Sequence, residues 1–250
     1  MIQRYFKSKG YETIIADPRE LKYRKGKLYH RNFRIDLVYR RAIFKELMER
    51  IEDVRDFLNA YRDGAVCVVN PLRSRLVSNK ATLAIMTNHK EFRGFFTEEE
   101  NRFISRHVPW TRLVADMQTH YENNLVFLLK FIVHHKDNLV LKPADSYGGK
   151  NVTIGRETRQ EEWTKLVNAI LVNKEDWVVQ KYVEITEMSV PELKDGEVSL
   201  IKKKYNLNPF VFGHRYAGSM ARLSEQSVIN VSAGGGLVPA VKYALHGKKE

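Results

Sequence analysis

Apolar and polar positions along the chain alternate between two periods, and this pattern predicts a mixed α/β protein. Residues 21–30 predict a hairpin that turns at Lys25-Gly26. Short β-branched and aromatic runs predict strands at 11–16, 34–40, 66–69, 140–142, 152–154 and 177–183. Apolar residues at spacings of three and four predict helices at 2–8, 42–61, 98–107, 124–135 and 159–173. Asn79 is placed to cap one more helix, which begins near Ala81.

The pattern becomes all-β after Pro191. Turns are expected at Asp195-Gly196 and at Gly213, where glycine permits a positive φ. The strands expected in this part are 197–203, 209–212, 216–223 and 228–231.

Composition allows a sizeable core, because 43% of the 250 residues are hydrophobic. The single cysteine, Cys67, excludes a disulfide within the chain and fits the reducing cytoplasm. No apolar run approaches the ~20 residues that a membrane-spanning helix needs. We therefore expect a cytoplasmic protein with no membrane partner.

The formal net charge of +12 attracts anions, and the basic residues cluster locally at 21–34 and 201–204. Nucleotides, acidic peptides and nucleic acid are all anions that a protein of this charge could attract. No zinc finger, helix-turn-helix or aromatic RNA-binding pattern accompanies it, so a nucleic-acid partner is the weaker hypothesis.

The sequence NLVLKPADSYGGKNVTIG at residues 138–155 predicts a strand, a glycine loop and a second strand. Gly148 and Gly149 allow backbone N–H groups to approach phosphate oxygens, and Lys142 supplies a point charge for the same oxygens. A P-loop would instead open a helix, so this hairpin predicts a lid over phosphates. The alternative is an ordinary tight hairpin whose glycines serve only the turn.

Two further segments contain candidate ligand-binding residues. The apolar run WVVQKYVE at 177–184 ends in polar residues, which suits adenine recognition by backbone groups with Glu184 on the ribose hydroxyls. Strand alternation places Arg222 and Asn230 on faces of two neighbouring strands, where phosphates and Mg²⁺ could meet. Each segment also has a plain structural interpretation, as a core strand reaching the surface or as an exposed hairpin.

The order of these segments resembles the circularly permuted ATP-grasp proteins of type 2, relatives of glutathionylspermidine synthase. The resemblance implies an ATP-grasp fold, in which two α+β subdomains clasp ATP. It implies part of a pre-ATP-grasp, substrate-side α/β region at 1–78 and an ATP-grasp domain at 79–250. Within that domain we expect a lid subdomain at about 109–180 and a β-rich subdomain at 181–250. The segments that carry the resemblance are IIADPRELKY (14–23), RIDLVYRR (34–41), NPLRSRLVSNKATLAIMTN (70–88), VPWTRLV (108–114), LVLKPADSYGGKNVTIG (139–155), WVVQKYV (177–183) and ARLSEQSVINVSAGGGLVP (221–239).

The family pattern also implies roles for individual residues. Lys80 and Lys142 would contact the ATP phosphates, and Arg222 would stabilise the transferred phosphoryl group. Asn230 would bind Mg²⁺, and Arg40 and Arg41 would face the acceptor or phosphate side. Ser146, Tyr147, Gly148 and Gly149 would form the lid, and Gln180, Lys181, Val183 and Glu184 would line the adenine and ribose sites.

The activity implied is an ATP- and Mg²⁺-dependent carboxylate–amine ligase that forms an acyl phosphate from a small-molecule or peptide carboxylate. The chain departs from the family where acidic metal ligands are usual, with Val228 two residues before Asn230 and Asn206 in place of an Asp. A catalytically impaired nucleotide-binding domain, acting as sensor or scaffold, is therefore the alternative. The chain also looks N-terminally shorter than the family, which leaves room for a partner chain that supplies the missing portion.

Overall fold

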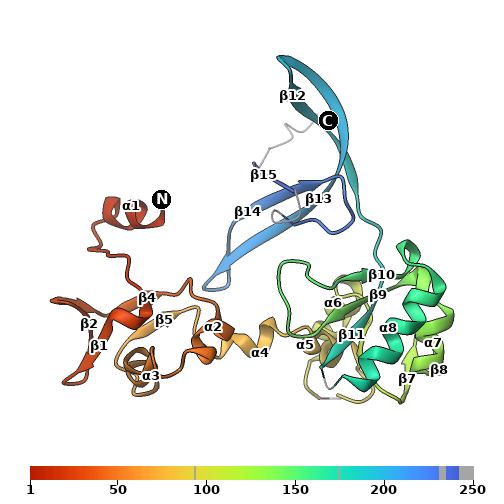
Figure 1. The fold of residues 1–250 in the computed structure, drawn as a ribbon, viewed down its shortest axis with the longest axis horizontal. Coiled ribbons are helices and arrows are strands. Elements are labelled where there is room, and N and C mark those ends of the chain that lie inside the picture. The colour runs from red at the N-terminus through yellow and green to blue at the C-terminus, as the bar shows by residue number, and fades with distance from the viewer. Residues whose placement is uncertain (93, 174, 231–234, 242–250) are drawn as a thin grey trace. The chain divides into compact units, whose positions relative to one another are not determined.

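The computed structural model of the protein describes residues 1–92, 94–173, 175–230 and 235–241 (Figure 1). The chain divides into two compact units, Met1–Ser78 and Asn79–Glu250, and each is described by itself. The fold is mixed α/β, as the sequence predicts. Among the described residues no helix is both long and apolar enough to cross a membrane.

The unit Met1–Ser78 contains a three-stranded antiparallel sheet, β1-β2-β3, and a parallel strand pair, β4 and β5. Apolar side chains from these strands pack with α2 and α3 around Leu28, Phe57 and Ala60. The elements are α1 (Ile2–Ser8), η1 (Pro18–Glu20), β1 (Leu21–Arg24), β2 (Lys27–His30), β3 (Phe33–Ile35), β4 (Leu37–Tyr39), α2 (Phe44–Glu49), α3 (Arg55–Arg62), β5 (Cys67–Val69) and α4 (Ser74–Ser78).

Three sequence expectations for this unit are wrong in part. Residues 11–16 form no strand, although Ile14 and Ala16 still pack against the core. The strand expected at 34–40 is interrupted at Asp36, which separates β3 from β4. The helix expected at 42–61 is two helices, because the chain leaves helical geometry at Arg50 and brings Val54 into the core, where it is 2% exposed.

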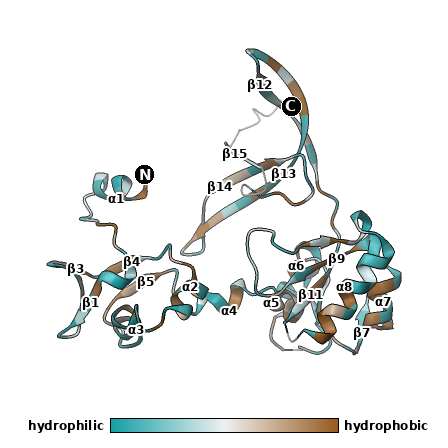
Figure 2. Ribbon diagram, viewed as in Figure 1, coloured by the Kyte–Doolittle hydropathy of each residue, from teal (hydrophilic) through white to brown (hydrophobic). Residues whose placement is uncertain are grey.

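The first part of Asn79–Glu250 contains a four-stranded antiparallel sheet in the order β10-β9-β11-β6. One face of β9 and β11 packs with α7 and α8 around the fully buried Trp163, and Figure 2 shows hydrophobic residues along these elements. The elements are α5 (Ala81–Thr87), α6 (Glu98–His107), β6 (Thr111–Leu113), β7 (Gln118–Tyr121), β8 (Asn124–Phe127), α7 (Leu128–His134), η2 (Lys136–Asn138), β9 (Leu139–Pro143), β10 (Thr153–Ile154), η3 (Gly155–Glu157), α8 (Gln160–Val172) and β11 (Trp177–Lys181).

The helix expected at 124–135 is wrong in its first four residues, which form β8 and pair with β7. Glu122 adopts a φ of 53° in the tight turn between these strands, so the chain reverses before the helix begins at Leu128. The helix expected at 98–107 is confirmed, and a capping box begins it: the Thr97 hydroxyl accepts from Glu100 N, and the Glu100 carboxylate accepts from Thr97 N.

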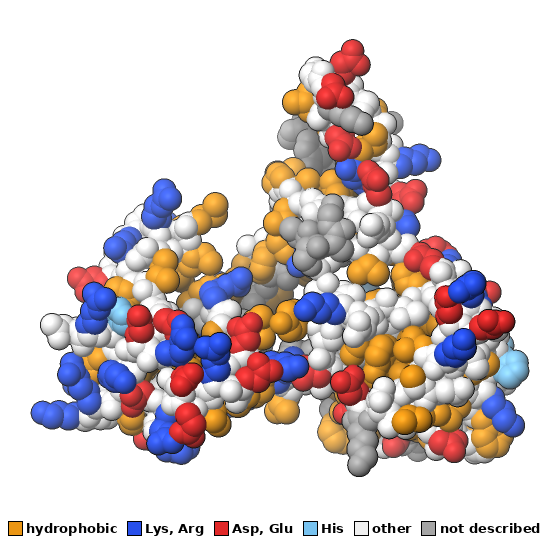
Figure 3. Space-filling model, in the orientation of Figure 1, with side chains coloured by type: hydrophobic (Ala, Val, Ile, Leu, Met, Phe, Trp, Pro, Cys, Tyr) orange, Lys and Arg blue, Asp and Glu red, His pale blue; other side chains and the backbone are white. Residues whose placement is uncertain are grey.

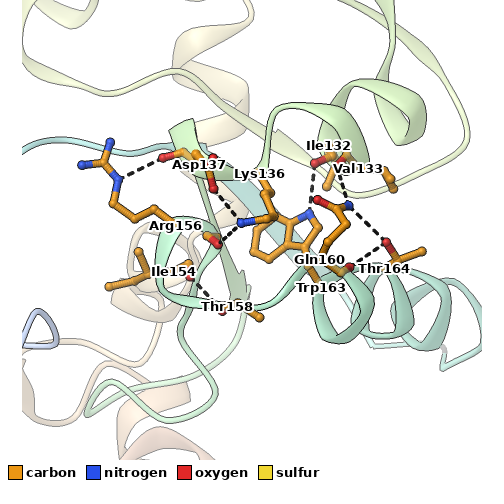
Figure 4. A network of polar contacts seen from close by, with 11 residues as sticks. Ile132, Val133, Lys136, Asp137, Ile154, Arg156, Thr158, Gln160, Trp163 and Thr164 are labelled. Carbon is orange, nitrogen blue, oxygen red and sulfur yellow. Dashed lines mark hydrogen bonds and ion pairs between the residues drawn. The ribbon is translucent and has the colours of Figure 1, made fainter.

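A network of polar contacts holds the base of the glycine hairpin (Figure 4). Trp163 Nε1 donates to Ile132 O at 3.0 Å, which joins α8 to α7. Lys136 Nζ donates to Gly155 O at 3.1 Å, and Arg156 Nε donates to Asp137 O at 3.0 Å. Gly155 has no room for a side chain, because a Cβ there would lie 1.9 Å from Lys136 O. Strand β10 therefore starts a rigidly anchored segment.

The C-terminal part is an antiparallel sheet in the order β12-β13-β14-β15. The expected turns at Asp195-Gly196 and Gly213 are confirmed by positive φ angles. The two strands expected at 197–203 and 209–212 are one long strand, and residues 228–230 form none; residue 231 lies outside the described residues. The elements are β12 (Glu187–Lys194), β13 (Glu197–Phe212), β14 (Arg215–Ser224) and β15 (Gly236–Pro239).

Candidate nucleotide site

Lys142 and Gln180 lie on the face of β9 and β11 opposite the core. Their neighbours Leu141 and Val179 point into the core, because successive side chains of a strand alternate between faces. Lys142 Nζ donates to Gln180 Oε1 at 2.7 Å, and Gln180 Nε2 donates to Thr111 Oγ1 on β6 at 2.9 Å. A chain of hydrogen bonds across three strands thus fixes the direction of the Lys142 side chain.

Burial lowers the pKa of Lys142, and the nearby positive charge of Lys80 lowers it further. Both causes disfavour the charged amine in the free protein. An anion placed against Lys142 would relieve both, so this position is suited to a phosphate.

Lys80 is the residue directly before α5, and its side chain extends to the end of β9 and the start of the glycine loop. Its N–H donates to Ala144 O at 3.0 Å, and its Nζ donates to Pro143 O at 3.0 Å and Ser146 O at 2.6 Å. Asn79 Oδ1 accepts from Ala81 N at 2.9 Å and so holds the start of α5. The structure therefore brings together the two lysines that are 62 residues apart in sequence.

The glycine loop between β9 and β10 has three residues in the left-handed region. Gly148 and Gly149 have φ angles of 72° and 75°, and Asn151 has 57°. Ser146 Oγ donates to Lys150 O at 3.3 Å, and Tyr147 is 55% exposed. The loop is thus a turned segment with an exposed tip, and its role as a lid stays a prediction.

Residues 228–230 lie directly against this loop. Asn230 Nδ2 donates to Gly148 O at 2.5 Å, and a Cβ on Gly149 would lie 2.6 Å from Val228 Cγ1. A second contact joins the two parts of the unit, since Ser227 Oγ donates to Glu157 Oε1 at 2.5 Å. The C-terminal segment and the loop therefore form one assembly.

Arg222 lies on β14, opposite Asn206 of β13 and Leu237 of β15. Its Nε is buried and finds no hydrogen-bond partner among the residues that the structure describes. A buried donor without a partner costs free energy, and an acceptor oxygen from a ligand would satisfy it. Asn206 Oδ1 is already engaged, because it accepts from Asn208 Nδ2 at 2.8 Å.

The expected neighbour of Arg222 is different from the one observed. Strand β15, at Gly236–Pro239, pairs with β14, whereas Asn230 lies in a loop before it. Gly235 N donates to Asn230 O at 2.9 Å, and a Cβ on Gly235 would lie 2.8 Å from that oxygen. Asn230 is held by Gly235 and bonds to Gly148 of the loop instead of lying beside Arg222 on a strand.

The residues expected around adenine and ribose are divided between two faces. Gln180 shares the face of Lys142, whereas the side chain of Lys181 lies on the other face, 3.4 Å from Glu122 Oε1. Lys181 N donates to Trp110 O at 2.9 Å. Val183 is 57% exposed.

Glu184, expected at the ribose, forms an exposed ion pair with Arg156 at 2.5 Å. The Arg156 guanidinium also stacks on the ring of Tyr182, with 3.9 Å between Cζ and the ring centroid. A ribose at this position would have to compete with Arg156 for the carboxylate.

Arg40 belongs to the unit Met1–Ser78. Its Nε donates to Asn70 O at 2.9 Å and its Nη1 donates to Ala42 O at 2.5 Å, while burial lowers its pKa. Arg41 follows it in the same segment, before α2. The guanidinium of Arg40 holds backbone carbonyls in this structure, and a role toward substrate stays a prediction.

The candidate metal site is not built from a cluster of acidic side chains in the described part of the chain. Within residues 1–92, 94–173, 175–230 and 235–241, no three His, Cys, Asp or Glu side chains gather in a way that could hold a metal. Asn230 Nδ2 donates to Gly148 O, and its amide oxygen is the atom through which it would bind a metal ion. Mg²⁺ sites in proteins usually include at least one carboxylate.

Sequence reasoning missed Thr111 and Arg112. Thr111 bonds to Gln180, and Arg112 bonds to Thr111. Thr111 is fully buried, and Arg112 is 4% exposed without a carboxylate partner in the described part of the chain. The Arg112 guanidinium donates to Thr119 Oγ1, Thr87 O, Thr111 O and His120 O, and burial lowers its pKa to about 10. A Thr-Arg pair inside an apolar strand was the available sign of this network.

The sequence profile described as circularly permuted ATP-grasp type 2 matches residues 7–224. The chain therefore belongs to the circularly permuted ATP-grasp type 2 family. Among individual proteins, it is similar to one from Frankia casuarinae provisionally named glutamate–cysteine ligase 2-2. The identity is 28% over 111 residues, which make up 42% of this chain and 12% of that protein.

The crystal structure of the D-cycloserine synthetase DcsG matches 92% of this chain and 64% of that one, with 17% sequence identity and a TM-score of 0.44. The chain thus spans less than two thirds of the length of either protein.

Proposed function

We propose that the chain is an ATP-dependent ligase that joins a carboxylate to an amine. The observation that carries the proposal is the convergence of Lys80, Lys142 and the Gly148-Gly149 loop on one face of the sheet. Two cations and a turn rich in accessible backbone suit the triphosphate of a nucleotide. Membership of the ATP-grasp family supports the same class of ligand and reaction.

In this proposal the substrate carboxylate attacks the γ-phosphorus of ATP, and ADP leaves. The amine then attacks the carbonyl carbon of the acyl phosphate, and inorganic phosphate leaves as the amide bond forms. Lys80 and Lys142 neutralise the phosphates, and the Arg222 guanidinium donates to the transferred phosphoryl group through its unpartnered Nε. Positioning and charge neutralisation supply most of the acceleration in such transfers.

The remaining predicted residues have assigned places in the proposal. Ser146, Tyr147, Gly148 and Gly149 cover the phosphates, and the segment after Gln180 contacts adenine, through the backbone at Lys181 and Val183. Glu184 accepts from the ribose once Arg156 releases it, and Arg40 binds the acceptor. The name of the Frankia casuarinae relative supports amino acids as the class of carboxylate and amine substrates.

A second candidate function follows from the lack of acidic metal ligands near the proposed site. Val228 packs against Gly149 where the family usually has a carboxylate, and the described residues contain no acidic cluster for Mg²⁺. These observations favour a domain that binds nucleotide as a sensor or scaffold and does not turn it over. Asn230 alone would then contribute little to a metal ion.

Isothermal calorimetry with ATP, in Mg²⁺ and again in EDTA, separates the two functions. A ligase site gives metal-dependent binding and releases phosphate with a panel of amino-acid carboxylates and amines. The sensor gives metal-independent binding and no phosphate release. In either case Lys142→Ala should weaken ATP binding at least about 100-fold, because a charge-assisted phosphate contact is lost.

Lys165→Ala, which removes an exposed cation from α8, is the matched control and should leave affinity unchanged. If Lys142→Ala binds ATP as tightly as the parent protein, the proposed site is wrong.

A further inference from the structure

The positive charge of the protein is concentrated in the unit Met1–Ser78. This unit has 18 Lys and Arg against 10 Asp and Glu, whereas residues 79–250 have 24 against 20. Fewer than a third of the residues thus carry two thirds of the net charge of +12. The proposed nucleotide site in Asn79–Glu250 does not account for this surplus.

The surplus maps onto one face of the sheet β1-β2-β3. The strand register places Leu21, Tyr23, Leu28 and Ile35 on the inner face, where they pack in the core. The outer face consists of Lys22, Arg24, Lys27, Tyr29 and Arg34, and all five positions are described. Four cations surround one aromatic ring, and none of the five strand positions is acidic. Figure 3 shows Lys and Arg side chains projecting from this unit.

The turns at the ends of these strands add more positive charge. Lys25 and Arg31 are exposed and adopt φ angles of 49° and 55°, a conformation that Gly or Asn adopts more easily. In the part of the chain that the structure describes, Lys25, Lys27 and Arg31 have no carboxylate within ion-pair distance. These cations are therefore available to an external anion.

The other cations of this face are only weakly engaged. Lys22 lies 3.7 Å from Asp56 and Arg34 lies 2.6 Å from Asp36, both in exposed pairs of the kind that add little stability. In the second basic cluster, at 201–204, two of the three lysines have partners: Lys203 pairs with Glu192, and Lys204 Nζ donates to Ser227 Oγ. The sheet face is thus the unsatisfied cluster of the two.

We propose that the outer face of β1-β2-β3 binds the backbone of single-stranded nucleic acid without sequence preference. The Arg24 guanidinium lies over the Tyr29 ring with 4.5 Å between Cζ and the ring centroid, and both groups are of the kind on which a base can stack. The surrounding lysines neutralise phosphates. An acidic peptide would satisfy the same charges, but its carboxylates would not supply a base to stack on the Tyr29 ring.

The test is the binding of a fluorescein-labelled oligo(dT) to the full chain, followed by fluorescence anisotropy between about 50 and 200 mM salt. The parent protein should bind with an affinity that falls steeply with salt. Lys25→Gln/Lys27→Gln should weaken binding about tenfold, and should make the slope of log K against log salt shallower by about 1.4, since each single-strand phosphate contact contributes about 0.7. Arg106→Gln/Lys165→Gln, which removes two exposed cations from α6 and α8, is the matched control and should change neither.

Four results would overturn the proposal. They are no binding of oligo(dT), equal losses in the two double variants, preferential binding of a polyglutamate peptide, or loss of binding in Lys142→Ala or on adding ATP. The last would place the nucleic acid in the nucleotide site. An unchanged circular dichroism melting curve establishes that Lys25→Gln/Lys27→Gln is folded. Calorimetry with ATP on the same variant keeps a failure of the nucleotide site distinct from a failure of this one.

Discussion

The two halves of the candidate nucleotide site differ in how far they are already organised. On β9 and β11, Lys142 is held by Gln180, which is held in turn by Thr111. On β14, Arg222 has a buried Nε without a partner in the described part of the chain. One half is therefore preorganised by its own hydrogen bonds, whereas the other half lacks an acceptor. We therefore expect a bound ligand to form its most stabilising new hydrogen bond on the β14 side, with Arg222 Nε.

The largest expected effect on activity comes from replacing Arg222, whose buried Nε has no partner in the described part of the chain. Arg222→Gln keeps a polar side chain but removes the charge and the Nε donor, so phosphate release should fall by roughly 100-fold. Because the donor has no partner to lose, the melting temperature should stay the same or rise. Phosphate-release assays and differential scanning calorimetry measure the two effects. A strong loss of stability with unchanged turnover would show that Arg222 is structural.

The contact between the loop and residues 228–230 gives a matched pair of variants. Gly148→Ala and Gly149→Ala both place a side chain at a positive φ, but only Gly149→Ala adds a clash, with Val228 Cγ1. We expect Gly149→Ala to weaken ATP binding about tenfold more than Gly148→Ala. Calorimetry with ATP measures the difference. Equal losses would mean that the close approach of Gly149 to Val228 does not matter for ATP binding.

The preorganised half can be loosened at Thr111. Thr111→Val keeps the shape of the side chain but removes the acceptor for Gln180 Nε2, so the amide loses its fixed orientation toward Lys142. ATP affinity should fall by about two- to fivefold, the size of one neutral hydrogen bond. Thr111→Ser keeps the hydroxyl and should restore the affinity. A positioning role fails if Thr111→Ser is as weak as Thr111→Val.

The smallest expected effect is a proton taken up on binding. The pKa of Lys142 is lowered in the free protein, and bound phosphate favours the charged amine and raises that pKa. Between the two pKa values ATP binding takes up a proton, so affinity falls as the pH rises. Calorimetry at alkaline pH in buffers of different ionisation enthalpy measures this uptake, and Lys142→Met should abolish it. Proton release in the parent protein would contradict the assigned surroundings.

Stability has the opposite dependence on pH at the same residue. The folded pKa of Lys142 lies below the unfolded one, so the unfolded chain binds more protons between the two values. The free energy of unfolding should therefore rise with pH across that window, as the buried amine loses its charge.

The sequence predicted the preorganised half of the site better than the other half. The segment 138–155 and the strand after Trp177 contain strong local patterns, and the structure places Lys142, Gln180 and the glycine loop where those patterns suggest. The role of Lys80 could be inferred only from the family resemblance, because it lies 62 residues from Lys142 in sequence. Thr111 was missed because the partner that links it to the site, Gln180, is distant in sequence.

The errors have a common physical cause, which is tertiary packing that overrides a local pattern. Alternation suggested a strand at 228–231, but Asn230 bonds to the lid instead and β15 takes the place beside β14. Helical spacing continues through 42–61, so the pattern gave no sign of the break between α2 and α3 that buries Val54. Cys67 lies in an apolar run, whose pattern alone would place it in the core, yet it is exposed on β5 although Val66 and Val68 are buried beside it.

The contact of Val228 with Gly149 has a consequence for how this protein can change over evolution. A side chain at 149 and the present side chain at 228 exclude each other, because a Cβ at 149 would lie 2.6 Å from Val228 Cγ1. The two positions should therefore vary together among relatives. A side chain at 149 would require a smaller residue at 228 and would also have to adopt the positive φ of this position.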